Sequence, residues 1–250
     1  MRDFTLSKYE NLLVALNKRG VQIYGVKCWV EQKPDRGVLI RHDVDRKPIN
    51  ALKVAELELK HNTFTTYYFR SKKNSFKPEI IKEIAEMGHE IGYHYENLSD
   101  CKGSYRRAIN DFEKNLNILR EVTEINTIAM HGKPLSQYKN DSLWNKYNYK
   151  KYGILAESFN TIDYTDTYYF TDTGRVWQNN KNNLRDKVNT TLSADINSTE
   201  ELIKFIDKEM KVAVVVHPER WNDDIIGWVY SYIFDVFANT TKKFLEGIRK

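Results

Sequence analysis

Cysteine is scarce in this sequence, because only Cys28 and Cys101 occur among its 250 residues. The two lie far apart and form no Cys-x-x-Cys pair, which excludes a disulfide framework or a thiolate zinc site as the basis of the fold. Proline and glycine are also few, with 5 and 11 residues, and no stretch rich in glycine, serine or proline divides the chain. We therefore expect residues 1–250 to form a single domain.

Long apolar runs are absent as well. No stretch approaches the roughly 18–20 apolar residues that a membrane-spanning helix needs. Residues 1–20 carry charges within their apolar stretch, which is typical of an amphipathic helix and not of a secretory signal. The 39 basic residues are spread among 34 acidic ones, and they form no tract suited to nucleic acid. These absences lead us to expect a cytoplasmic enzyme or binding domain, with neither a nucleic-acid partner nor a transmembrane segment.

What the sequence does contain is a regular alternation of short β-rich segments and helical segments from residue 36 onward. This alternation predicts an α/β fold with a parallel sheet. An N-terminal helix at about 6–18 and an aromatic-rich helical segment at 225–250 are expected to pack on its exterior. We expect strands at 38–44, 63–70, 89–95, 125–131, 153–158, 168–173 and 212–217, and helices at 49–61, 77–88, 105–122 and 199–210.

Polar side chains stand at the ends of most of the predicted strands. They are Asp43, Asp45, Arg70, His94, His131, Glu157 and His217. Because the carboxyl ends of parallel strands meet at one rim, where active sites are built, we expect these side chains to form a functional site. Carboxylate and imidazole groups together suit zinc and related divalent metals, and a catalytic metal site keeps a position open for water. The residue types therefore favour metal-assisted hydrolysis.

Four stretches resemble, in this order, the motifs of the NodB-like polysaccharide deacetylases. They are "HDVD" at 42–45, "GHEIGYH" at 88–94, "HGKP" at 131–134 and "VVVHP" at 214–218. Members of that family are metal-dependent carbohydrate deacetylases on a distorted (β/α) barrel. The resemblance covers about residues 36–220 and implies a single-domain barrel of this type, with the N-terminal helix and the C-terminal segment as additions.

The resemblance also implies roles for individual residues. Asp43 corresponds to the catalytic base of the family, and Asp45 to its metal-binding aspartate. His94 corresponds to the first metal-binding histidine, and His217 to the general acid. The implied cofactor is a divalent metal, with zinc as the first expectation.

Two positions depart from the family pattern. Its second metal-binding histidine lies four residues after the first, where this chain has Leu98. The arginine of its third motif is replaced by His131. We therefore predict that His131 completes the metal site with Asp45 and His94, and that Glu96 substitutes if His131 is out of reach.

Several other polar residues receive predictions with alternatives. His42 alternates away from both aspartates and is expected to orient a metal ligand from behind, whereas His89 is expected to be structural. The stretch "YFTDTGRVW" at 169–177 is either a turn or a loop that contacts the substrate. The predicted substrate-binding residues are Arg70, Glu157, Asp172, Arg175 and Trp177.

The predicted activity is that of a metal-dependent amide hydrolase. It would remove an N-acetyl or similar acyl group from an amino sugar in saccharide or polysaccharide biosynthesis, and a nucleotide- or lipid-linked saccharide is among the candidate substrates. One alternative is a catalytically inactive sugar-binding or scaffold protein on the same fold, which the leucine at position 98 favours. Another is a hydrolase of a different C–N bond, such as that of a formyl group or a cyclic amide.

Overall fold

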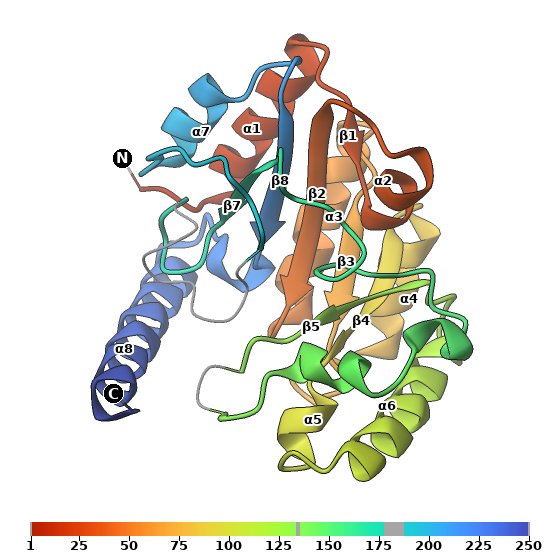
Figure 1. The fold of residues 1–250 in the computed structure, drawn as a ribbon. Coiled ribbons are helices and arrows are strands. Elements are labelled where there is room, and N and C mark those ends of the chain that lie inside the picture. The colour runs from red at the N-terminus through yellow and green to blue at the C-terminus, as the bar shows by residue number, and fades with distance from the viewer. Residues whose placement is uncertain (1, 134–135, 178–187, 250) are drawn as a thin grey trace.

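A parallel β-sheet with helices along its outer face forms the body of the protein (Figure 1). The computed structural model describes residues 2–133, 136–177 and 188–249. Among these, the strand order is β6-β5-β4-β3-β2-β8-β7, with β1 beside the first half of β2, and every pairing is parallel. The strands are β1 (Ile23–Tyr24), β2 (Gly37–Val44), β3 (Thr66–Phe69), β4 (Glu90–Tyr95), β5 (Thr127–Met130), β6 (Ala156–Glu157), β7 (Tyr168–Thr171) and β8 (Lys211–Val216).

The sheet curves into a half-barrel, because no pairing between β6 and β7 closes it within the described residues. The predicted parallel α/β barrel is confirmed in this open form. The predicted start of the barrel at about residue 36 is too late, since β1 pairs with β2 through Ile23 and Val38. The strand of only two residues at β1 was too short to be recognised from its sequence pattern.

The predicted helices begin within about one residue of the observed ones, but the helix predicted at 199–210 ends at Phe205, and α2 and α5 were not predicted. Pro48 and Pro78 stand in the first turns of α3 and α4. Backbone N–H groups in the first turn have no partner within the helix, so the N–H that proline lacks is not needed there. Ser198 caps α7 by accepting a hydrogen bond from the backbone nitrogen of Glu201. The α-helices are α1 (Leu6–Lys18), α2 (Val26–Gln32), α3 (Pro48–Lys60), α4 (Pro78–Glu86), α5 (Asn97–Asp100), α6 (Tyr105–Arg120), α7 (Thr199–Phe205) and α8 (Ile225–Arg249).

Strand β2 is the centre of the sheet and is buried along its whole length. It pairs with β8 on one side and with β3 on the other, so Asp43 lies opposite Tyr68 of β3. Side chains alternate between the two faces of a strand. Arg41 and Asp43 therefore face the inside of the half-barrel, and His42 faces the outer helices.

Two apolar clusters fill the space on either side of the sheet. The larger cluster joins the outer face to the helices and includes Leu12 and Leu16 of α1. The smaller cluster lies inside the half-barrel, where Leu39 and Tyr68 pack near Trp29 of α2. The interior is thus filled with side chains toward the amino ends of the strands, which leaves the carboxyl ends for the polar residues.

Helix α8 differs from the expectation. It leaves the body of the molecule and runs past the carboxyl ends of the strands (Figure 1). The prediction that its apolar side chains pack on the barrel is wrong, because Ile226 is 78% exposed and Ile233 is 61% exposed. Among the described residues, no helix has both the length and the hydropathy needed to cross a membrane.

Candidate metal centre and catalytic site

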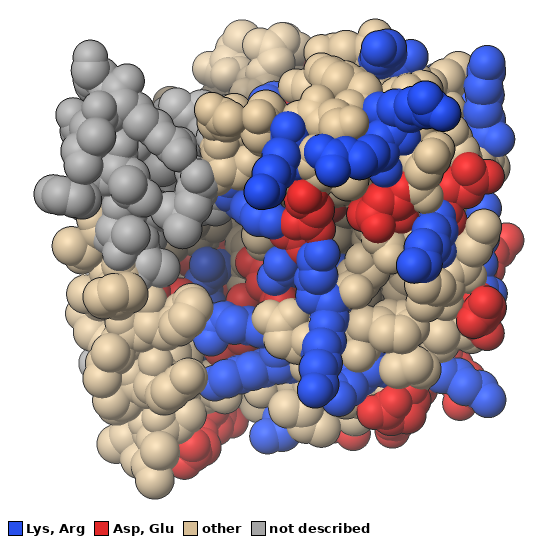
Figure 2. Space-filling view, turned by 90° about the horizontal axis from the view of Figure 1, so that it is seen from below, with Lys and Arg blue, Asp and Glu red and all other residues tan. Residues whose placement is uncertain are grey.

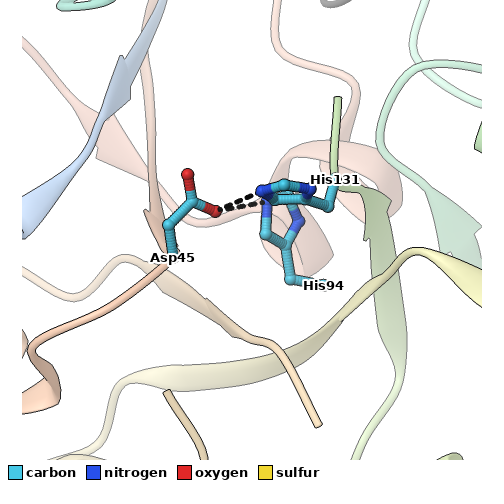
Figure 3. Close-up of side chains that lie close together, drawn as sticks. All are labelled: Asp45, His94 and His131. Atoms are coloured by element: carbon cyan, nitrogen blue, oxygen red, sulfur yellow. Dashed lines mark ion pairs between the residues drawn. The ribbon is translucent and has the colours of Figure 1, made fainter. Parts of the chain in front are cut away.

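Three predicted metal ligands meet at the carboxyl ends of β2, β4 and β5. Asp45 Oδ1 lies 3.4 Å from His94 Nε2 and 3.2 Å from His131 Nε2. The carboxylate and both imidazole rings point toward one another (Figure 3). One ligand atom from each residue falls within 4.8 Å of the other two. The structure thus brings His131, and not a residue at position 98, to Asp45 and His94.

The donor atoms fit a divalent metal ion. Tetrahedral zinc with bonds of about 2.0–2.2 Å sets its ligand atoms about 3.3 Å apart, close to the separations found here. Asp45 Oδ1 is buried and makes no hydrogen bond with the described residues, although two ring nitrogens are this near. His94 Nδ1 lies 3.0 Å from the carbonyl oxygen of Ala129. Donation of its N–H there leaves Nε2 free to act as a ligand.

The charges around these residues favour a cation. Burial alone would raise the pKa of Asp45, but the two histidines hold it well below its ordinary value. Burial works against a charged His94, yet Asp43 and Asp45 raise the pKa of its imidazole. A positive charge shared by these side chains, whether a proton or a metal ion, is therefore stabilised.

The predicted base, Asp43, lies beside this centre. It is buried, and its Oδ2 is 4.0 Å from His94 Nε2. The same oxygen accepts a hydrogen bond from Arg41 Nη2 at 3.3 Å. Asp43 Oδ1 makes no hydrogen bond with the described residues. One carboxylate oxygen is thus held by Arg41, while the other is available to a reactant.

Arg41 is a site residue that the sequence interpretation missed. It is buried, donates to Ser158 Oγ, and its guanidinium carbon lies 4.4 Å from the centre of the Phe159 ring. Asp43 raises the pKa of Arg41 against the effect of burial, so the guanidinium remains charged. Its position two residues before Asp43 was a signal that strand alternation could have used.

The predicted general acid, His217, follows β8, which neighbours β2 in the sheet. Its Nδ1 lies 2.6 Å from Asp172 Oδ1, and its backbone nitrogen donates to Asp172 Oδ2. Arg220 and Trp221 also donate to this carboxylate. Burial and Arg220 oppose the charged imidazole, but Asp172 raises the pKa of His217. A raised pKa suits a group that must give up a proton near neutral pH.

Glu96 supports the centre from one side. Its Oε2 lies 3.7 Å from His131 Nδ1 and 3.3 Å from Lys133 Nζ, and its Oε1 accepts a hydrogen bond from Arg70 Nε at 2.9 Å. The backbone nitrogen of Lys133 also lies 3.3 Å from His131 Nδ1. Since His131 reaches Asp45 directly, Glu96 is not required as its substitute, and its carboxylate lies beside that histidine as a charge partner.

Leu98 lies in the short helix α5 and is only 2% exposed. It belongs to the larger apolar cluster together with Met130 of β5. The side chain that replaces the expected ligand therefore contributes to the core. The candidate ligand set is instead completed from the next strand end, at His131.

The prediction for His42 is wrong, because it contacts no residue of the metal centre. It is fully buried on the outer face of β2, where its Nε2 lies 2.9 Å from Glu58 Oε1. Its ring stacks on Tyr67 with centroids 4.2 Å apart. His89 is structural, as predicted, and its ring nitrogens lie near the backbone of Ala55 and Thr65.

Four of the predicted substrate-binding residues are committed to other contacts. Glu157 is fully buried and accepts hydrogen bonds from Tyr95 and from backbone amides. Trp177 is fully buried and donates to Thr199. Asp172 orients His217, as described above. The predicted substrate contacts of these three residues are therefore wrong. The fourth residue, Arg70, donates to Glu96 and to the carbonyl oxygen of Asp45.

Arg175 is also directed elsewhere. Its Nε donates to Asp235 of α8 at 2.9 Å, and its guanidinium lies over the ring of Trp228. The predicted substrate contact is corrected to an anchor for α8.

Another residue missed from the sequence is Glu219, which is buried and whose Oε2 makes no hydrogen bond with the described residues. Burial, followed by the charge of Asp45, raises the pKa of Glu219 to about 7.

No protein-family model matches the chain, and a search of curated proteins finds no significant match. Solved structures do resemble it, at low sequence identity. A Streptococcus mutans CE4 esterase has a TM-score of 0.47 and 13% identity, over 92% of this chain and 91% of that chain. Bacillus subtilis PdaA, a family 4 carbohydrate esterase, has a TM-score of 0.45 and 14% identity, over 91% and 83%.

A CE4 family pseudoenzyme from Bacillus anthracis is similar too, with a TM-score of 0.45 and 12% identity over 83% of this chain. The chain spans 63% of the length of that protein. Both enzymes and a pseudoenzyme are thus present among the similar structures.

Proposed function

We propose that the protein is a metal-dependent hydrolase that removes an acetyl or similar acyl group from the nitrogen of an amino sugar. The observation that carries this proposal is the meeting of Asp45, His94 and His131 beside the buried carboxylate of Asp43. Zinc is the metal that this donor set suits best. When bound by these three residues, it would lower the pKa of water and stabilise negative charge on the acyl oxygen.

Asp43 supplies the base in this proposal. Its free Oδ1 accepts a proton from water as the water oxygen bonds to the acyl carbon. Arg41 holds the other carboxylate oxygen, so the base is oriented before the substrate arrives. The same guanidinium is itself fixed by Ser158 and Phe159.

His217 supplies the acid. Asp172 binds its Nδ1 side, which leaves Nε2 as the atom that can donate a proton. The C–N bond breaks as this proton passes to the sugar nitrogen, and the products are the carboxylate and the free amino sugar. Asp172 stabilises the charged imidazole before the transfer and keeps its ring in place.

The substrate class rests on the resemblance of the four motifs to carbohydrate deacetylases. A role in saccharide or polysaccharide biosynthesis, a nucleotide or lipid linkage of the sugar, and a cytoplasmic location stay predictions. The alternative of an inactive sugar-binding or scaffold protein is favoured by Leu98, which cannot bind a metal. It predicts a protein that binds saccharide and holds no metal.

Metal analysis combined with an acetate-release assay tests the proposal. The purified protein is loaded with zinc, its metal content is measured, and an N-acetylglucosamine oligosaccharide serves as the substrate. We expect about one zinc per wild-type chain and release of acetate. His131→Ala should lose the metal and the activity, whereas Glu96→Ala should bind zinc about 10- to 100-fold more weakly.

His61→Ala is the matched control, because this histidine lies at the end of α3 and pairs with Glu10 away from the site. It should retain both zinc and activity. Full zinc occupancy in His131→Ala would remove this residue from the metal centre. Absence of zinc and of acetate release in the wild type, with the oligosaccharide still bound, would establish the inactive alternative.

A further inference from the structure

Helix α8 has most of its apolar side chains on the exposed face and buries polar ones against the body. The two buried residues that it turns toward the body are polar, since Ser231 donates to the carbonyl oxygen of Glu219 and Asp235 pairs with Arg175. Trp228, which is half-buried, lies on the same side and donates to the carbonyl oxygen of Asp3. The residues that it turns outward are apolar or aromatic. Ile225, Ile226, Val229, Tyr230, Ile233, Phe234 and Val236 are between 42% and 78% exposed. A helix on a water-facing surface shows the opposite pattern, so the outward face requires an apolar partner.

The width of this face limits what can cover it. At 3.6 residues per turn, the seven outward residues span about half of the helix circumference. The seam of a two-stranded coiled coil is narrower, since it uses only two positions in every seven. Pairing with a second α8 would leave much of the apolar arc in water. A lipid interface accommodates an arc of this width, because the helix sinks into it lengthwise.

Basic and aromatic side chains flank the arc. The guanidinium of Arg46 lies 3.7 Å from the centre of the Phe234 ring, and Lys47 Nζ lies 4.5 Å from that of Tyr230. Further lysines stand on the loops at the same end of the molecule, among them the exposed Lys73 and Lys102. Lys and Arg side chains are spread across this end in the view onto it, with Asp and Glu side chains among them (Figure 2). Tyrosine and lysine in such positions suit the head-group region of an anionic bilayer.

We propose that α8 docks the protein on an anionic lipid surface, with the carboxyl-end rim of the half-barrel turned toward the membrane. Arg46 and Lys47 directly follow the metal-site residue Asp45, so the docking helix and the metal centre share one edge of the molecule. If the proposed hydrolase activity holds, on which this last step rests, the substrate is an N-acyl saccharide presented at the membrane by a lipid anchor.

Vesicle co-sedimentation tests the docking without metal or substrate. The wild-type protein is mixed with vesicles of phosphatidylcholine and phosphatidylglycerol, and with vesicles of phosphatidylcholine alone. We expect binding to the mixed vesicles that weakens when phosphatidylglycerol is left out or salt is raised. The double variant Ile226→Glu/Ile233→Glu should bind the mixed vesicles more than about tenfold more weakly.

The control variant is Leu59→Glu/Leu155→Glu, which changes two exposed leucines outside α8 and should bind as the wild type does. Equal binding by the α8 variant, or no binding by the wild type, would overturn the proposal. So would a wild-type dimer in sedimentation equilibrium that the α8 variant abolishes without any vesicle binding, since a second copy would then cover the face. Equal binding to both kinds of vesicle would overturn the anionic preference.

A second readout separates this inference from the proposed activity. The α8 variant should hydrolyse a water-soluble N-acetylglucosamine oligosaccharide at the wild-type rate, because neither isoleucine contacts the metal centre. Loss of vesicle binding with hydrolysis retained shows that the docking face acts apart from the chemistry. Vesicle binding by a wild-type protein that releases no acetate would leave the docking in place and refute the hydrolase.

Discussion

The two faces of β2 each carry a buried cluster of charge, but the clusters differ in how completely they are paired. On the outer face, both carboxylate oxygens of Glu58 accept hydrogen bonds, from Tyr9, His42, Thr65 and Tyr67. On the inner face, Asp43 Oδ1 and Asp45 Oδ1 make none with the described residues. Both clusters have carboxylates and imidazoles, so composition alone does not distinguish a structural cluster from a functional one.

Carboxylate oxygens without a hydrogen bond are the distinguishing feature, since the atom left without one in the outer cluster is a ring nitrogen, His42 Nδ1. A buried polar atom without a hydrogen bond costs free energy, and it persists where an absent ligand, ion or reactant would satisfy it. We therefore expect substitutions on the two faces of β2 to have opposite effects on activity and stability. Substitutions on the inner face should reduce activity while leaving the protein folded, and substitutions on the outer face should reduce stability while leaving the activity of folded molecules unchanged.

The largest expected effect is that of Asp43→Asn on activity. Asparagine keeps the size of the side chain but cannot accept the proton, so the turnover number should fall by about 10³-fold or more. Zinc content should stay near the wild-type value, and the melting temperature should fall because buried Arg41 loses its charged partner, with the protein still folded at assay temperature. Acetate release measured together with metal content checks this, and an Asp43→Asn protein with wild-type turnover would remove Asp43 from its proposed role.

The next effect in size is that of Glu58→Gln on stability. Despite its burial, the neighbouring His42 holds the pKa of Glu58 at about 2, below its ordinary value of 4.5. The unfolded chain therefore binds the proton more readily between these values, and the stabilisation is complete above pH 4.5 and is lost as the pH falls toward 2. The difference corresponds to about 3 kcal/mol at pH 7.

Denaturant unfolding from pH 7 to pH 3 measures this effect. The wild type should lose stability below pH 4.5, whereas Glu58→Gln should begin less stable and lose less on acidification. Acetate release per folded molecule should be unchanged. A strong loss of turnover in well-folded Glu58→Gln would show that the two faces of β2 are functionally coupled, which the comparison does not predict.

A smaller effect is expected for Asp172→Asn. Its carboxylate raises the pKa of His217, and the proposed acid works only while it is protonated. Without that charge the pKa of His217 falls, so activity should be lost at a lower pH on the alkaline side. We expect about a 30-fold loss at pH 8 and a smaller one at pH 6. A uniform loss at every pH would instead indicate that only the position of His217 had changed.

The smallest effect is expected for Arg41→Lys. Lysine retains the charge beside Asp43 but cannot contact Asp43 and Ser158 with one planar group. Turnover should fall about tenfold, with the Michaelis constant nearly unchanged, because the substitution disturbs the base and not the sugar. A change confined to the Michaelis constant would place Arg41 in substrate binding.

Much of the fold could be predicted from the sequence, because its signals are local. The apolar run at 212–216 indicates β8, and Ser198 marks the start of α7, without information from distant residues. β1 and α5 were missed because two- and four-residue elements carry too little pattern. The apolar residues of α8 were read correctly as a helix, but their spacing could not tell which side would face the body.

Some residues of the candidate site could be predicted from the sequence, and others could not. Strand ends that carry Asp45, His94 and His131 converge by topology, which strand alternation predicts. The roles of Arg41 and Asp172 depend on which partner each side chain finds across the half-barrel. The alternation along β2 directs His42 away from both aspartates and toward Glu58 of α3, so the predicted role behind a metal ligand is excluded by its own face of the strand.

The position of His131 has a consequence for recognising distant relatives. In this half-barrel, β4 and β5 are neighbours, so His94 at the end of one and His131 after the end of the other reach the same carboxylate. Candidate ligands that meet in space can therefore lie several tens of residues apart in the chain, as His94 and His131 do. In a parallel sheet, the order of strand ends is therefore a better guide to a candidate metal centre than any fixed spacing of histidines.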